Sequence, residues 1–578
     1  MGSLKKIKFL FPYLKEDKVF LIFSAIFGLF AVSSKVAIPF ITGLAIDQMK
    51  KGNFSIQNYL FFIIGFVILG SICRYLFDFL VAILNQKLIK KMRIDLFASY
   101  QQLPFSYLDT HSNGDLLKRL IADLENIQNG LILGASILYE GLLQILITIF
   151  MMMYVNWILA LVVICLTPLS VIVSRFISKS NSKYFKQQSK VEGELASYSL
   201  ETLNNLGTVA SYNLSNKREA RFDEINKINK KANFKAFFAT SWINPSTRLV
   251  NNIIYASVTL IGAFLCLETI KNGSFAGTTM TVGFLSTFLS YSYQYMTPFN
   301  DISSVSTEVI YAITSLERVN EIISAPKDIN DGKLEIKGDV ERLSAKNITF
   351  SYNAERKIIK NFNLDFYKGH KIALVGPTGC GKTTIVNLLM RFYDPQEGSF
   401  EFNEISSFEL EKDMLRSHIG LVLQESFLLH ASIKDNICFG TNYSDEEVVN
   451  AAKKARAHEF IIKLKDGYDT IISNDSELSY GQRQLISIAR IIINKPEIII
   501  LDEATSNIDL RTELMLSKSL DELMEGKTSV VIAHRLSTIK NAHHIVVLKD
   551  GEIVQQGNFK QLVTEEGLFK EIYNSQFA

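Results

Sequence analysis

The sequence predicts an all-α membrane domain of six long helices fused to an α/β domain that is organised around a glycine-rich loop. Long apolar runs are confined to the first half of the chain, and short apolar runs alternate with polar turns in the second half. The glycine-rich stretch, Gly376–Thr384, stands between a strand-like run and a helix-like run. These patterns predict a membrane domain at residues 1–323, a linker at 324–335 and an α/β domain at 336–578.

Length and composition set the broad class. A chain of 578 residues is too long for one hydrophobic core, so at least two domains are expected. The net charge of +3 is nearly balanced, which argues against a general polyanion-binding protein. The five cysteines are scattered without metal-ligand spacing or a disulfide framework, so we expect their thiols to be reduced or buried.

The first half carries the membrane signal. Residues 4–15 are basic and amphipathic, and they predict a short interfacial helix and not a cleaved signal peptide. Crossing a bilayer takes about 20 apolar residues in a helix. Six candidate spans lie at about residues 19–46, 59–84, 131–154, 157–177, 240–266 and 276–298.

The distribution of basic residues predicts the orientation of these spans. Two long connections, residues 86–123 and 175–235, are rich in Lys and Arg, whereas the other connections are short and carry few charges. Basic loops stay in the cytoplasm, so both termini are expected there. The long connections look helical, which extends the membrane helices into the cytoplasm.

Charged and amide side chains interrupt the apolar runs. Arg74 and Asp78 are four residues apart on one helix face, and we expect them to neutralise one another. Glu140 and Gln144 have the same spacing in the third span. A carboxylate inside a membrane is a candidate functional group, so Glu140 either contacts substrate or accepts a helix–helix hydrogen bond.

Two further features of the spans are polar. The sixth span contains Ser290–Tyr295, whose aromatic and hydroxyl groups suit the wall of an amphipathic cavity or plain packing. Tyr291 and Tyr295 are its candidate substrate-contacting residues. The first span is interrupted only by Lys35.

The glycine-rich stretch fits the pattern G-x-x-x-x-G-K-[ST]. Glycines let backbone N–H groups surround a phosphate, and the following helix N-terminus adds a positive dipole end. The lysine of this pattern reaches the β- and γ-phosphates and the next hydroxyl holds Mg²⁺. The expected ATP-binding residues are Gly376, Pro377, Thr378, Gly379, Cys380, Gly381, Lys382, Thr383 and Thr384, with Thr383 also a Mg²⁺ ligand. The alternative is a tight strand-to-helix turn without a ligand.

Two later strands supply catalytic candidates. The run 498–501 ends in Asp502 and Glu503, and we expect it beside the strand that precedes the glycine-rich loop. There Asp502 would bind Mg²⁺ through water, and Glu503 would polarise the attacking water as general base. The run 529–533 delivers His534 to the same sheet edge, where it would contact the γ-phosphate.

The motif Leu478–Gln484 identifies a family. It resembles the LSGGQ signature of ABC ATPases, and with six spans the chain resembles a half-transporter of the ABC exporter type, of the type IV fold. The residues around the motif are similar to those in the catalytically complete subunit of bacterial heterodimeric multidrug exporters. The resemblance implies ATP-driven export of amphipathic compounds from a multi-pass protein of the cytoplasmic membrane, with ATP and Mg²⁺ as cofactors.

The resemblance also implies residue roles. Tyr352 would stack on adenine, Gln424 would contact Mg²⁺ and couple to the membrane domain, and Asp509 would belong to the D-loop. Coupling helices are implied near residues 105–113 and 206–213. The residues implied to face ATP held by a partner half-transporter are Leu478, Ser479, Tyr480, Gly481 and Gln482.

Two departures from the family pattern stand out. Tyr480 stands where the signature has glycine, and residues 472–477 lack the usual Gly-Glu-x-Gly loop.

We expect a heterodimer, with a homodimer as the alternative. A lipid or peptide exporter would have the same architecture. The six spans argue against a soluble nucleic-acid ATPase, and the fusion of spans and ATPase argues against an importer.

Overall fold

The computed structural model describes residues 8–50, 57–274, 279–328, 332–353, 356–423, 426–472, 478–502, 510–532 and 539–576. The chain divides into two compact units. The helical unit comprises Met1–Gln101 and Ser112–Ala325, and the α/β unit comprises Gln102–His111 and Pro326–Ala578. The short segment Gln102–His111 therefore packs with the α/β unit although the helices on either side of it do not.

The helical unit is built from long helices. Its short N-terminal turns are η1 (Lys8–Leu10), α2 (Phe11–Leu14) and η2 (Lys15–Asp17). The first two long helices are α3 (Lys18–Lys50) and α4 (Gln57–Gln101). The next helical stretch consists of the consecutive segments α6 (Asn113–Lys118), η3 (Arg119–Asp123), α7 (Leu124–Leu133), η4 (Gly134–Tyr139) and α8 (Glu140–Val155). The remaining helices are α9 (Trp157–Asn204), α10 (Leu206–Ser211), α11 (Ser215–Ser241), α12 (Ile243–Asn272) and α13 (Val282–Ile323).

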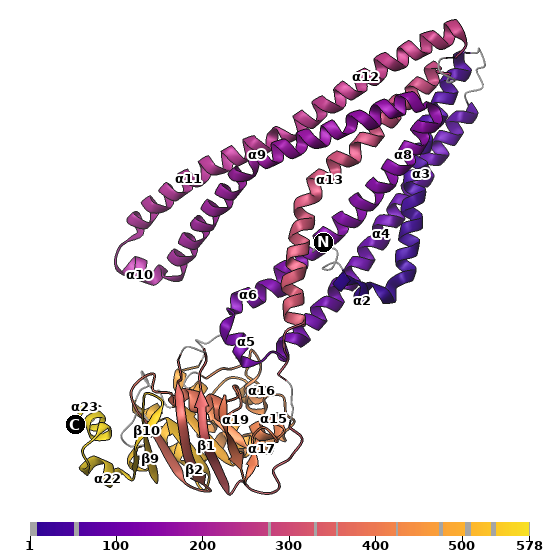
Figure 1. Ribbon diagram of the computed structural model, residues 1–578. Coiled ribbons are helices and arrows are strands. Elements are labelled where there is room, and N and C mark those ends of the chain that lie inside the picture. The colour runs from indigo at the N-terminus through magenta and orange to yellow at the C-terminus, as the bar shows by residue number, and fades with distance from the viewer. Residues whose placement is uncertain are drawn as a thin grey trace. The chain divides into compact units, whose positions relative to one another are not determined.

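Two groups of helices make up this unit (Figure 1). Helices α3, α4, α8 and α13 pack together, while α9 runs out to α10 and the chain returns along it through α11 and α12. Helices α9 and α13 continue far beyond their apolar stretches, and the location of these extensions in the cytoplasm stays a prediction.

Four stretches of the described residues are long and apolar enough to cross a membrane: Phe11–Met49, Gln57–Gln101, Asn113–Val155 and Arg248–Asn272. The apolar stretch Trp157–Leu169 is shorter, and α13 carries many hydroxyl groups along its length. Several of these hydroxyls, including Ser290, Ser292 and Thr297, donate to the carbonyl four residues back. Internal pairing of this kind lowers the cost of polar groups in a lipid-facing helix.

Buried ion pairs join η3 to the end of α13. The Asp123 side chain is fully buried and receives hydrogen bonds from Ser315 and Arg318. Nearby, Arg119 pairs with Asp115 and with Glu321 at 2.9 and 2.8 Å. These contacts hold the helix that follows Ser112 against the helix that leads into the α/β unit.

The α/β unit contains two sheets. The first is antiparallel, in the order β2 (Ile359–Tyr367), β1 (Arg342–Phe350), β4 (Glu397–Phe402) and β5 (Ile405–Ser406). The second has the order β10 (Glu552–Gly557), β9 (His544–Lys549), β3 (Lys371–Val375), β8 (Thr528–Ile532), β7 (Ile498–Asp502) and β6 (Ile419–Val422). Its strands are parallel except for β10.

The strand order corrects one expectation. Strand β7, which ends in Asp502, does not lie beside β3, because β8 pairs with both. Each of these strands is a short run of buried aliphatic residues, so any of their pairings satisfies the hydrophobic pattern equally well. Chain connectivity and helix packing decide the order, and neither is local in the sequence.

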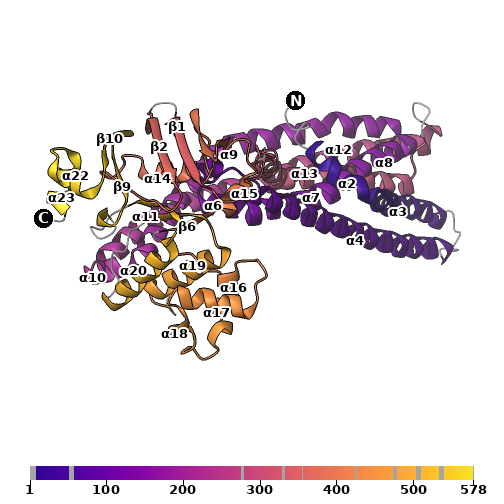
Figure 2. The same cartoon turned by 90° about the horizontal axis from the view of Figure 1, so that it is seen from below.

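The helices of this unit cover its sheets. They are α5 (Phe105–Thr110), α14 (Lys382–Leu389), α15 (Lys412–Ser417), α16 (Ile433–Cys438), α17 (Asp445–Lys454), α18 (His458–Ile461), η5 (Gly467–Asp469), α19 (Tyr480–Asn494), α20 (Leu510–Met524), α22 (Phe559–Thr564) and α23 (Leu568–Gln576). Helices α16 to α20 gather on the side of the unit away from β1 and β2 (Figure 2).

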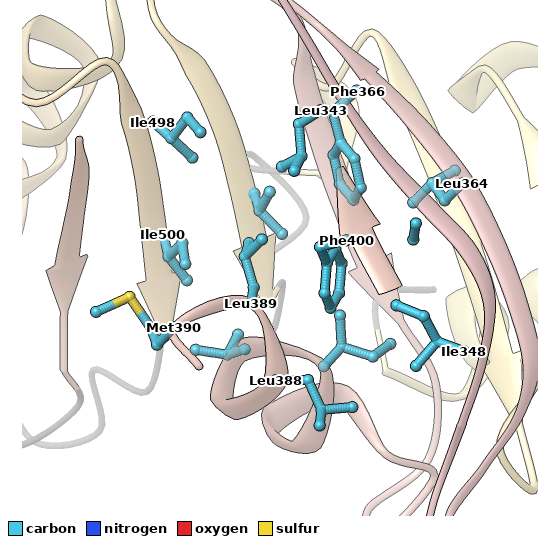
Figure 3. Close-up of a cluster of buried hydrophobic side chains, with 14 of the residues drawn as sticks. Leu343, Ile348, Leu364, Phe366, Leu388, Leu389, Met390, Phe400, Ile498 and Ile500 are labelled. Atoms are coloured by element: carbon cyan, nitrogen blue, oxygen red, sulfur yellow. The ribbon is translucent and has the colours of Figure 1, made fainter. Parts of the chain in front are cut away.

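The main core lies between the two sheets around α14. Leu388 and Leu389 of α14 pack among Phe366 and Phe400 of the first sheet and Ile500 of the second (Figure 3). All five side chains are almost completely buried, which anchors the end of α14 against both sheets. Burying an aromatic or leucine side chain stabilises the fold by about 1.5–3 kcal/mol.

The buried pair between Asp123 and Arg318 yields a stability prediction. Replacing Asp123 with Asn should lower the stability of the helical unit by about 3 kcal/mol, because the guanidinium loses its buried counter-charge. Thermal unfolding of the purified chain in detergent measures the effect as a lower Tm.

The matched control is Glu224→Gln, which breaks the pair between Arg221 and Glu224 on α11. Both of its side chains are more than half exposed, so the change should be below about 1 kcal/mol. Equal Tm shifts in the two variants would contradict a structural role for the buried pair.

Candidate functional site

The loop between β3 and α14 forms a cradle of backbone groups. Gly379 and Gly381 have φ values of 82° and 107°, which residues with a side chain rarely adopt. A Cβ on Gly381 would also lie 2.5 Å from the Ile359 Cδ1 atom. Glycine is therefore required here, and the loop leads directly into the N-terminus of α14, where unpaired N–H groups attract anions. The geometry fits a chain of phosphates.

Polar side chains at the start of α14 complete this cradle. The buried Lys382 ammonium donates to the carbonyl oxygens of Gly376 and Pro377 at 2.6 and 3.1 Å. The Thr383 side chain is exposed at the first turn, a position where its hydroxyl can ligate a cation. Burial raises the pKa of the neighbouring Cys380 thiol, which therefore stays protonated at neutral pH.

The carboxyl ends of the parallel strands meet at the edge where this loop lies. Asp502 ends β7 at that edge, paired in register with Ile532 of β8. The Asp502 carboxylate and the loop therefore lie at the same end of the sheet. One strand, β8, separates β7 from β3, whereas the sequence predicted that β7 and β3 would be neighbours. Residues Gln424, Glu503, Asp509 and His534 lie outside the described residues, so their predicted roles remain predictions.

Tyr352 is held in place by aromatic edges. Its ring meets Phe350 and Tyr393 edge-on, with ring centroids 4.9 and 5.0 Å apart. Its hydroxyl accepts a hydrogen bond from Asn387 at 3.2 Å and donates to Thr384 at 3.4 Å. The ring is 44% exposed, so it can stack on an aromatic base while remaining tied to the helix that follows the cradle.

The segment Phe105–Thr110 contacts the same aromatic group. Phe105 stacks on Phe392 with centroids 4.9 Å apart, and the Tyr393 hydroxyl donates to the Asp109 carboxylate. Burial, assisted by that hydrogen bond, raises the pKa of Tyr393. Sequence reasoning did not identify Tyr393, although its place directly after the α14 turn was a usable signal. Tyr393 thus links helix α5 to the Tyr352 ring.

The sequence motif at Leu478–Gln482 begins a helix. Ser479 is the N-cap of α19, and its hydroxyl and the Gln482 side chain form a reciprocal capping box. Tyr480 is the first helical residue and Gly481 is buried. The N-terminus of α19 is therefore a second, separate site where backbone donors and a dipole end favour an anion.

Further along α19, two side chains attach it to the neighbouring loop. Gln484 donates to the Leu423 carbonyl at 3.0 Å, and Arg490 donates to the Phe427 carbonyl at 3.1 Å. Burial lowers the pKa of Arg490 to about 10, so it stays charged at neutral pH. These contacts join α19 to the segment in which Gln424 lies.

In the helical unit, the predicted pair of Arg74 and Asp78 is confirmed at 2.8 Å, and Arg74 also pairs with Glu140. Gln144 accepts a hydrogen bond from Lys35 at 3.0 Å and donates to the Gln294 carbonyl at 2.6 Å. The side chains of Lys35, Arg74, Glu140 and Gln144 border a cavity of about 300 Å³ among α3, α4 and α8.

The structure does not bring Tyr291 and Tyr295 to that cavity. Tyr291 is fully buried in the helix core and donates to the Val36 carbonyl at 3.0 Å. Tyr295 is also buried and packs edge-on against Phe299. Both rings act in helix packing in this arrangement, because Tyr291 and Tyr295 are four residues apart and so fall on the same inner face of α13. Sequence reasoning instead overlooked Lys35 as a cavity residue.

Comparison with known protein families identifies both halves of the chain. Residues 21–299 match the family model described as the ABC transporter transmembrane region. Residues 359–506 match the model described as ABC transporter.

Individual relatives cover almost the whole chain. An uncharacterized ABC transporter ATP-binding protein of Bacillus subtilis is 33% identical, covering 100% of this chain and 94% of the relative. The ATP-dependent lipid A-core flippase of Haemophilus influenzae is 31% identical over 100% of this chain and 98% of the relative. A fatty acid ABC transporter ATP-binding/permease protein of Mycobacterium bovis is 32% identical over 84% and 76%.

A solved structure has the same fold. A bacterial Atm1-family ABC exporter with ATP bound matches with a TM-score of 0.79 over 97% of this chain and 98% of that chain, at 24% identity.

The position of the Tyr352 ring yields a binding prediction. Tyr352→Ala should weaken ATP binding about tenfold, because stacking on a base contributes ~1–3 kcal/mol. Tyr352→Phe keeps the ring and loses only the hydroxyl contacts with Asn387 and Thr384, so it should bind within about threefold of the wild type. Equilibrium titration of the purified chain with a fluorescent ATP analogue measures both.

Tyr367→Ala provides the control, because it removes another half-exposed tyrosine from the same unit. If Tyr352→Ala bound the analogue as tightly as Tyr367→Ala, stacking by Tyr352 would be wrong.

Proposed function

The chain belongs to the ABC transporter family, and from this premise we propose that it exports amphipathic compounds of the multidrug type across the cytoplasmic membrane by alternating access. Membership makes it a multi-pass membrane protein with an ATPase coupled to transport. The observation that carries the proposal is the presence of a phosphate cradle and a second anion-binding helix end in a unit fused to membrane-length helices.

The cradle supplies one half of the ATP site. Its backbone N–H groups and Lys382 would hold the phosphates, with the adenine on the Tyr352 ring. Thr383, Asp502 and Gln424 would hold Mg²⁺, which neutralises charge on the phosphates. Glu503 would orient and deprotonate the attacking water, and His534 would contact the γ-phosphate. The exposed threonine at the helix start and the carboxylate at the β7 end are oxygen donors of the type that Mg²⁺ prefers.

The other half of each ATP site would come from a partner. ABC exporters function as dimers, and we propose that the N-terminus of α19, capped by Ser479, meets ATP bound to the partner half-transporter. Ser479 and the first N–H groups of the helix would supply donors that the cradle of one chain does not provide. We favour a heterodimer, because residues 472–477 and Tyr480 depart from the common pattern.

Coupling to the membrane would run through short helices. α5 is held to the α/β unit by the Phe105 stack and by the Asp109 contact with Tyr393. Closure of two α/β units around ATP would therefore carry α5, and with it the ends of α4 and α6. Helix α10 would make the second connection. ATP drives this change because it binds the closed arrangement better than the open one.

The membrane orientation follows from charge. The long basic connections form the extensions of α4, α9 and α11. From the positive-inside rule we infer that these extensions, the α/β unit and both termini lie in the cytoplasm.

A lipid or peptide exporter is the alternative. The printed names of two relatives refer to lipid A-core and to fatty acid, which favours amphiphiles with acyl chains. Reconstitution in liposomes decides between them: ATPase activity should be stimulated by cationic drugs if the multidrug proposal holds. Stimulation by lipids or short peptides alone would replace it with the corresponding alternative.

The general-base proposal gives a catalytic prediction. Glu503→Gln should reduce ATP hydrolysis at least about a hundredfold, since a positioned general base contributes 10²–10⁴-fold. ATP binding should persist, so the variant should accumulate as a closed, ATP-bound dimer, detected by native mass spectrometry.

The control is Glu565→Gln, which changes an exposed carboxylate at the end of α22 and should leave hydrolysis unchanged. Full turnover by the Glu503 variant would overturn the assignment of the base.

The proposed partner is tested by affinity purification of the tagged chain from its native membrane. A second ABC half-transporter in equal amount supports the heterodimer. Recovery of this chain alone, with ATPase activity, would establish a homodimer.

A further inference from the structure

The cavity among α3, α4 and α8 combines apolar walls with five polar side chains. Ala31, Val32 and Ile38 of α3 and Phe66 and Val67 of α4 form apolar walls. The polar side chains at its border are those of Lys35, Arg74, Glu140, Gln144 and Ser71, whose hydroxyl donates to the carbonyl of its own helix at Val67. Its volume of about 300 Å³ is at the lower end of the range of small-molecule sites. It is therefore large enough for a polar head group and too small for a complete lipid.

The Lys35 ammonium lacks a counter-charge in direct contact. Its one hydrogen bond goes to the neutral Gln144 amide at 3.0 Å, and no carboxylate of the described residues lies within 4.0 Å of it. Asp301 of α13 acts on it only as a more distant charge. A lysine in a membrane-spanning helix is costly and usually pairs with an anion. An anionic ligand group at Lys35 would meet this requirement.

The Glu140 carboxylate lacks a hydrogen-bond donor at one of its two oxygens. One of its carboxylate oxygens pairs with Arg74, while the other, Oε1, is buried without a hydrogen-bond partner. A buried carboxylate oxygen without a partner is destabilising, because it has lost water without gaining a donor. Arg74 is already shared between Glu140 and Asp78. A donor on a ligand would satisfy Oε1.

The charged side chains at the cavity border are of both signs. Among the described residues, Lys35 has no carboxylate in contact and Glu140 Oε1 has no donor, while Arg74 is already paired with Glu140 and with Asp78, which lies outside the border. A ligand that carries an anion and an N–H donor side by side satisfies Lys35 and Glu140 together.

We propose that this cavity binds the head group of a zwitterionic membrane amphiphile, with a phosphate at Lys35 and a primary ammonium at Glu140 Oε1. The inference rests on the proposed export of amphipathic compounds, and the substrate class that it names is the lipid class given above as the alternative to multidrug compounds. Acyl chains would leave the cavity past Val67 and lie along α4, where Ile64 and Ile68 are also exposed. An aliphatic helix face suits acyl chains, which keeps the rest of the molecule in contact with lipid.

Phospholipid head groups provide a sharp test. Phosphatidylethanolamine carries a phosphate and an ammonium with N–H donors. Phosphatidylcholine has the same charges but no N–H group, and phosphatidylglycerol has the phosphate without the ammonium. The full-length chain, with its partner if one co-purifies, is placed in nanodiscs that contain equal amounts of the three lipids. Native mass spectrometry after extraction then measures which lipids stay bound, without ATP.

The wild type should retain phosphatidylethanolamine about tenfold over each of the other two lipids, as expected for one charge-assisted hydrogen bond. Lys35→Gln and Glu140→Gln should each bring this ratio close to one. Asp78→Asn is the matched control, because it removes a carboxylate that pairs with Arg74 outside the cavity border, and it should keep most of the preference. Soluble phosphoethanolamine should not displace the lipid at equal concentration, because it lacks the acyl chains.

Equal retention of the three lipids by the wild type would overturn the inference, and this measurement needs no variant to fold. A preference that persists in both Lys35→Gln and Glu140→Gln would also overturn it. Drug-stimulated ATPase activity without lipid preference would leave the export function standing and remove only this site. Displacement by soluble phosphoethanolamine at equal concentration would show a head-group site that does not require a membrane amphiphile, and would overturn the substrate class.

Discussion

The need of a phosphate chain for many directed N–H donors organises the α/β unit. The cradle can present them only because β3 ends at the carboxyl edge of a sheet and α14 begins immediately afterwards. Packing of Leu388 and Leu389 between the two sheets holds that junction in place. The same edge receives Asp502, and the α14 turn leads to Asn387 and Tyr393, which position the Tyr352 ring. Anion binding and core packing thus depend on one strand-to-helix junction.

One junction of this kind does not make a complete site. The Ser479 end of α19 is a second anion-binding position in the same unit, and it belongs to a different helix from the cradle. A helix end with a capping box and a positive dipole end suits an anionic ligand that another chain holds. This arrangement gives a physical reason for dimerisation, since each chain would offer one cradle and one capped helix end.

In the helical unit the main constraint is the free-energy cost of charged side chains, which is high where water is absent. Many of its polar side chains are paired: Asp123 with Arg318, Arg74 with Asp78 and Glu140, and hydroxyls of α13 with their own backbone. Lys35 and the Oε1 atom of Glu140 are the exceptions around the cavity described above. Incomplete pairing in a low-dielectric region is a reason to expect a ligand.

Local patterns in the sequence were sufficient for features that depend on neighbours along the chain. The glycine-rich cradle, the Ser479 cap and the pair of Arg74 and Asp78 all involve residues within about a helical turn or a tight loop, where spacing determines geometry. The five cysteines, all within the described residues, form no disulfide, as expected, although Cys165 is exposed. Only the tertiary structure decided that β8 separates β3 from β7, that Tyr393 joins Tyr352 to helix α5, and that Lys35 meets Gln144. These contacts join residues far apart in sequence, and many pairings of apolar strands and helices satisfy the same hydrophobic pattern, so packing of the whole unit selects among them.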